Sequence, residues 1–85
     1  MNLFYELISD YAGEQIKKER KEWGMSRRLL AKLVKVDKET IKKIEEGYIC
    51  MLDIDLLRMI SEVLNVNMFS FFKRELTNEE MLEIV

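Results

Sequence analysis

The chain has 85 residues, 48% of them hydrophobic and 35% charged, which is enough for one compact domain and too few for two. It has no histidine and a single cysteine, so an internal disulfide is excluded, and zinc binding or histidine-based catalysis has no support. The net charge is −2, and no apolar run approaches the roughly 18 residues that a membrane helix needs, so we expect a soluble cytoplasmic protein.

The first part of the chain, from Leu3 to Trp23, has the apolar spacing of an amphipathic helix. Apolar residues recur there every three or four positions, as on a helix with one buried face. Because a glycine inside a helix costs about 1 kcal/mol relative to alanine, Gly13 predicts a division into a short N-terminal helix and a first domain helix. Gly24 is expected to end that second helix at Trp23.

Two short helices separated by a tight turn are predicted between Ser26 and Gly47. Ser26 and Asp37 stand at their N-cap positions, where a side-chain oxygen accepts a hydrogen bond from the backbone. The expected buried faces are Leu29, Leu30, Leu33 and Val34 in the first helix and Ile41 and Ile44 in the second. Two short helices joined in this way form a helix-turn-helix, whose common use is to bind DNA.

The connector that follows, residues 48–52, is unusually apolar for a loop. Asp53 is then expected to cap a further helix that ends near Asn65. A short apolar turn over residues 68–72 should pack back on the domain.

The tail, residues 73–85, has the N-terminal signature of one more helix. Thr77 and Glu80 have the spacing of a capping box, which predicts a short helix to about Ile84. A helix of this length is marginal alone in water, so it needs the domain or a second copy of the chain to pack against.

From residue 13 to residue 72, the joint spacing of these residues resembles the phage-repressor and Cro-like helix-turn-helix domains, also called the xenobiotic-response-element family. The matching residues are Ile16, Arg20, Gly24, Ser26, Leu30, Ala31, Val36, Thr40, Ile41, Ile44, Glu45, Gly47, Leu56, Leu57, Ile60, Leu64 and Val66. The resemblance implies an all-α, five-helix domain over 13–72, with a short extra N-terminal helix in residues 1–12 and a C-terminal helical tail in 73–85.

The resemblance also implies which residues contact DNA. The second helix of the motif, here about 38–46, lies in the major groove in this family. The positions that match base contacts are Lys38, Glu39 and Lys43. The positions that match phosphate contacts, or add charge beside them, are Ser26, Arg27, Arg28 and Lys42.

Two further matches concern the framework of the motif. Arg20 and Glu45 match a buried ion pair between the first and third helices of the family's fold. Ala31 falls where the two helices of the motif cross, and only a small side chain permits so close an approach.

Three departures from the family pattern are expected to matter. Glu46 stands where asparagine usually contacts phosphate, and a carboxylate there repels the DNA backbone. Lys35 occupies a turn position where glycine is common, so either it adopts a left-handed conformation or the turn is rebuilt. The connector 48–52 is apolar, whereas the family often has basic residues there.

The distribution of charge favours a DNA-facing side. Residues 13–48 hold eleven Lys and Arg against seven Asp and Glu, whereas residues 49–85 hold three against seven. The basic charge is therefore concentrated around the helix pair, as phosphate binding requires. A mixed, solvated surface is the plainer explanation of the same pattern.

Two interpretations of function stay open. The first is a sequence-specific DNA-binding transcriptional regulator, a repressor, that binds double-stranded DNA as a homodimer. The second is a protein-interaction module, an anti-repressor or antitoxin-like protein, that binds a protein partner through the 48–52 connector. An enzyme has the least support, since there is no histidine and no glycine-rich loop, and we expect no metal and no cofactor.

Overall fold

The computed structural model describes residues 2–85, which form six α-helices and two 3₁₀ turns. The α-helices are α1 (Leu3–Leu7), α2 (Ala12–Glu22), α3 (Arg27–Leu33), α4 (Lys38–Glu45), α5 (Ile54–Leu64) and α6 (Asn78–Ile84). The 3₁₀ turns are η1 (Ile49–Met51) and η2 (Met68–Phe71). The expected all-α fold is confirmed, and α2 to α5 with η2, a short fifth helix of 3₁₀ form, make up the expected five-helix domain.

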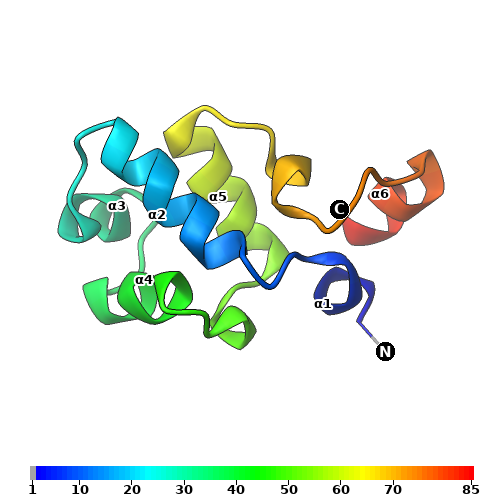
Figure 1. Ribbon diagram of the computed structural model, residues 1–85, viewed down its shortest axis with the longest axis horizontal. Coiled ribbons are helices and arrows are strands. Elements are labelled where there is room, and N and C mark those ends of the chain that lie inside the picture. Colours follow the sequence, from blue (N-terminus) through cyan, green and yellow to red (C-terminus); the bar gives the residue numbers. More distant parts are fainter. Residues whose placement is uncertain (1) are drawn as a thin grey trace.

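The helices fall into two groups along the longest axis of the molecule (Figure 1). The helices α2, α3, α4 and α5 gather at one end, and α1 and α6 lie beside each other at the other end. Within the first group, α4 packs against both α2 and α3. A single apolar core runs through both groups, because buried residues of α1, η2 and α6 join those of the helix-turn-helix.

Four predicted helix caps are confirmed by their hydrogen bonds. Ser26 Oγ accepts from the backbone of Leu29 at 3.0 Å, and Asp37 Oδ1 accepts from the backbone of Thr40 at 2.9 Å. The other two are Asp53, which caps α5, and the capping box of Thr77 and Glu80, which begins α6. Each cap satisfies a backbone donor that the first turn of a helix leaves free.

The predicted division of the first segment into two helices near Gly13 is confirmed, but Gly13 also has a packing role. The chain leaves its helical path at Ile8, α2 begins at Ala12, and Gly13 is the second residue of α2. A Cβ atom built on Gly13 would overlap the backbone oxygen of Ile44 and lie 2.9 Å from its carbonyl carbon. The glycine is therefore needed for the close approach of α2 to α4, which the sequence alone did not reveal.

The turn between α3 and α4 keeps its usual course with lysine in place of glycine. Lys35 has φ of 62°, in the left-handed region, so the first of the two alternatives for this position is the one adopted. The backbone N–H of Val36 donates to the carbonyl of Ala31 at 3.0 Å, which closes the turn after α3. Ala31 itself is buried at 3% exposure, where α3 contacts α4.

The buried face of α3 is narrower than predicted. Leu30 and Val34 are buried, but Leu29 and Leu33 are 45% and 47% exposed, so the expectation for those two leucines is wrong. A seven-residue helix that packs mainly on α4 and α5 can bury only one stripe of side chains.

The N-terminal helix α1 is bound to the segment around η2. The backbone N–H of Ser9 donates to Phe71 at 3.0 Å, and that of Lys73 donates to Leu7 at 2.8 Å. The rings of Phe4 and Phe72 meet edge to face at 5.7 Å between centroids. The apolar turn near residues 68–72 is thus largely covered by the chain itself, and α6 completes the cover by packing against α1.

Candidate nucleic-acid interface

A buried ion-pair network joins α2, α3 and α4. The side chain of Glu45 is fully buried, and its carboxylate accepts from Arg20 Nε at 2.7 Å and from Arg20 Nη2 at 2.9 Å. It also accepts from Arg27 Nε at 2.8 Å. A further nitrogen, Arg20 Nη1, donates to the backbone oxygen of Met25 at 2.7 Å, just before α3. One carboxylate therefore fixes the three helices relative to one another.

The protonation of Glu45 is set by two opposing effects. Burial of the carboxyl acts to raise its pKa, but the hydrogen bonds and charges of Arg20 and Arg27 outweigh burial and hold the pKa below its ordinary value of 4.5. The group therefore stays ionised at neutral pH, as both arginines require.

Arg27 has a partner that the sequence did not indicate. It was predicted to contact phosphate, but its Nε is held by Glu45 and its side chain is only 27% exposed. No local pattern signals this pair, since the two residues are eighteen positions apart. Arg27 also lines the pocket described next, so a phosphate contact by this residue stays a prediction.

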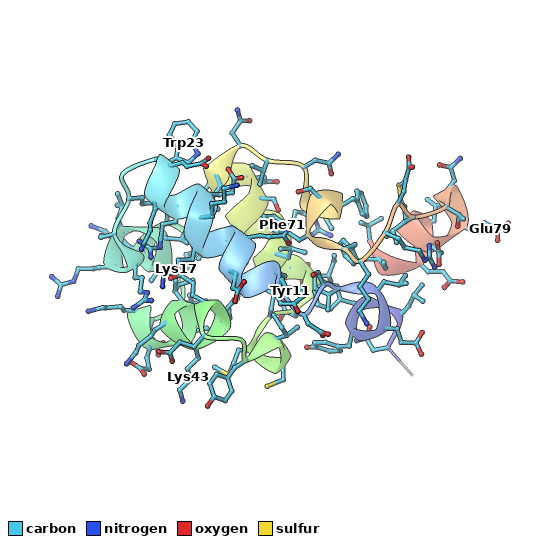
Figure 2. The ribbon with its side chains drawn as sticks, in the orientation of Figure 1. Tyr11, Lys17, Trp23, Lys43, Phe71 and Glu79 are labelled. Atoms are coloured by element: carbon cyan, nitrogen blue, oxygen red, sulfur yellow. The ribbon has the colours of Figure 1, made fainter. Side chains whose placement is uncertain are left out.

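Where α2, α3 and α4 meet, the surface is hollowed into a pocket lined almost entirely by cations, which we call the basic pocket. Its lining residues are Lys17, Arg20, Lys21, Ser26, Arg27, Arg28 and Lys38. The predicted residues Ser26, Arg28 and Lys38 are thus brought together. In Figure 2, Lys17 lies over the region between α2 and the α3–α4 pair, consistent with its place in this lining.

Lys17 and Lys21 were missed by the sequence analysis. Their i, i+4 spacing places both on one face of α2, which a helical reading of this segment does predict. The packing of α2 against α4 orients that face toward the predicted phosphate-binding residues. This orientation cannot be predicted from a local sequence pattern.

The outward face of α4 carries the residues predicted to contact bases. Lys38, Glu39 and Lys43 are exposed, and Figure 2 shows Lys43 projecting from the lower edge of α4. Lys42 is half-buried, and its Nζ lies 4.0 Å from Glu39 Oε1, so an exposed ion pair engages both. Such an exposed pair is weak. Base contacts by these residues remain predictions.

Two departures from the family pattern sit at the end of α4. Glu46 is the C-cap of α4 and is exposed, so its carboxylate faces solvent rather than a cation. In the connector, Leu52 is fully buried, Ile49 is half-buried, and Tyr48 and Met51 are 57% and 40% exposed. The connector therefore serves both as part of the core and as an exposed apolar strip.

Over residues 2–85, no three potential metal-ligating side chains come together. Within the same residues, no helix has the length and apolar character that crossing a membrane demands.

Comparisons with known proteins bear on the fold and on the family. The family model described as Helix-turn-helix matches residues 16–71. A search of curated proteins found no match.

Among solved structures, the cobalt(II) form of HppE in complex with substrate is similar, with a TM-score of 0.70 and 24% identity over 84% of this chain and 39% of that one. The iron(II) form of HppE has a TM-score of 0.68 with the same identity and coverage. The chain spans about two fifths of the length of these structures, and at this identity the likeness shows the fold alone.

Proposed function

The chain belongs to the helix-turn-helix family of phage-repressor and Cro-like DNA-binding domains, and from that premise we propose that it is a sequence-specific transcriptional repressor without catalytic activity. In this proposal α4 enters the major groove of double-stranded DNA and the residues around the start of α3 hold the phosphate backbone. The observation that carries it is the juxtaposition of the exposed face of α4 with the basic pocket. The proposal includes a cytoplasmic location.

The proposal includes a homodimer. Family members commonly bind two half-sites about 34 Å apart, which a two-fold dimer matches. Leu82 and Val85, on α6 and just after it, are 76% and 59% exposed, and they offer apolar surface for such an interface. A dimer would be expected to select DNA with two inverted half-sites.

The direct test is selection of bound sequences from a pool of random duplexes, followed by affinity measurements at increasing salt. We expect an enriched, inverted-repeat sequence whose binding weakens linearly in log affinity against log salt concentration. If no duplex is enriched and no salt-sensitive binding occurs at low ionic strength, the proposal is rejected.

Lys43→Ala is expected to alter which sequences are bound. A lysine in the major groove donates to O6 and N7 of guanine, and such a base contact contributes about 1–3 kcal/mol of discrimination. The variant should therefore lose preference at one base pair of each half-site, by about tenfold or more, in a repeated selection. An unchanged profile of selected sequences would show that Lys43 does not contact a base.

Arg28→Ala is expected to weaken binding to all duplexes alike. Arg28 is exposed and lines the basic pocket, so its removal should lower the slope of log affinity against log salt by about 0.9 without changing sequence preference. Lys73→Ala is the control, because Lys73 is also exposed but lies outside the basic segment 13–48. Equal changes in the two variants would mean that only net charge matters.

The exposed connector supports a second candidate. Tyr48 and Met51 expose apolar surface beside the acidic Glu46, which suits a protein partner better than phosphate. An anti-repressor or antitoxin-like module would use this strip and would not bind DNA. It becomes the favoured function if the selection experiment enriches no duplex.

A further inference from the structure

The basic pocket brings several like charges close together, which lowers the stability of the protein when no anion is bound. Lys17 and Lys21 lie one turn apart on α2, and like charges at this spacing destabilise a helix. Arg28 from α3 and Lys38 from the start of α4 line the same hollow. Among the described residues that line it, none is acidic. An anion is the class of ligand that such a convergence of cations attracts.

The network around Glu45 gives the pocket a rigid floor. Arg20 and Arg27 share the Glu45 carboxylate, so the two arginines and the carboxylate together carry one positive charge. Because Glu45 accepts from Arg27 Nε, the guanidinium is held in one orientation, and Arg27 lines the pocket in that orientation. Preorganisation of this kind lowers the entropy lost when an anion binds.

We propose that the basic pocket is a phosphate-binding site and that Lys17 and Lys21 of α2 are among its ligands. The helix α2 thus forms one side of the site, opposite the residues of α3 and α4. For the phosphate of a DNA backbone this inference rests on the proposed function and deepens it, since it adds a third helix to the contact with the duplex. The oxygen atoms of any phosphate group present the same chemistry to these side chains.

The test replaces each lysine with glutamine, which removes the charge and keeps a polar side chain of similar reach. Lys17→Gln and Lys21→Gln should each weaken duplex binding about five- to tenfold near 0.1 M salt and lower the salt slope by about 0.9. The matched control is Lys18→Gln, because Lys18 is exposed on the same helix but does not line the pocket. Circular dichroism and thermal unfolding check that the variants remain folded.

The control decides the outcome. If Lys18→Gln lowers the slope of log affinity against log salt as much as Lys17→Gln and Lys21→Gln do, the general electrostatic field of the protein, and not the pocket, attracts the duplex. In that case the inference is overturned. It is equally overturned if the two pocket variants retain the slope of the unmodified protein.

A second arm separates this inference from the proposed function. Inorganic triphosphate is titrated into the protein by calorimetry in the absence of DNA. One saturable site, lost in the Lys17→Gln/Lys21→Gln double variant and retained in Lys18→Gln, supports the phosphate site even if no duplex is bound. If neither triphosphate nor DNA responds to these lysines, the site does not exist, whatever the fate of the regulator proposal.

Discussion

Replacing Glu45 with alanine is expected to lower the free energy of unfolding by about 3–5 kcal/mol. The change leaves the buried Arg20, which is 6% exposed, and the half-buried Arg27 without the carboxylate that they share. Removal of one partner from a buried ion pair strands the other charge, which costs far more than loss of a surface pair. Since small domains are stable by about 5–15 kcal/mol, urea denaturation should show a large shift of midpoint.

The control for this variant is Glu46→Ala. Glu46 follows directly in sequence but is exposed, so its removal should change stability by less than about 0.5 kcal/mol. If Glu45→Ala were as mild as Glu46→Ala, the network would not hold the three helices together.

The same network gives the stability a defined pH dependence. The folded pKa of Glu45 lies below its ordinary value of 4.5, so in acid the unfolded chain binds a proton before the folded chain does. Its contribution is therefore complete above that value and is lost as the pH falls through the folded pKa. Glu80 also contributes stability that is lost in acid, because its hydrogen bonds with Arg74 and Thr77 lower its pKa to about 2. The acid-induced loss measured by urea titrations at a series of pH values should be smaller in Glu45→Gln.

Gly13→Ala is expected to destabilise the protein by about 3 kcal/mol, the upper end of what overpacking usually costs. Helix propensity alone predicts the opposite, a gain of about 1 kcal/mol from alanine inside a helix. The structure reverses the sign because the added methyl group would overlap the backbone of Ile44, which cannot move aside without separating α2 from α4.

The matched control for Gly13→Ala is Gln15→Ala. Gln15 lies two residues on in α2 and is exposed, so its replacement should leave the unfolding free energy within about 0.5 kcal/mol. A Gly13→Ala protein as stable as the original in thermal unfolding would disprove the close approach of the two helices.

Local signals were enough to predict most helix boundaries. The caps formed by Ser26, Asp37 and Asp53 depend on a side chain and a backbone donor within three residues, so they can be recognised without tertiary structure. Packing was harder. Leu29 and Leu33 fit the apolar period of a helix, but the width of the buried stripe depends on which neighbours α3 meets.

The candidate site was predictable where it follows the family pattern and not where it depends on contacts between helices. The exposed face of α4 and the start of α3 follow from matched positions. The contribution of Lys17 and Lys21 depends on how α2 is turned, and the second partner of Arg27 is eighteen residues away. Gly13 shows the same limit, because a glycine required by packing and a glycine that breaks a helix look identical in sequence.

The contact between α1 and α6 has a consequence for the order in which the protein folds. It joins residues 3–7 to residues 78–84, so it closes nearly the whole chain into a loop, whereas α3 and α4 are neighbours joined by a four-residue turn. The entropy of loop closure favours contacts between near neighbours, and distant ones are added once the rest of the chain is compact. The helix-turn-helix is thus the segment best placed to nucleate folding, and the paired ends are the segment that closes last and opens first.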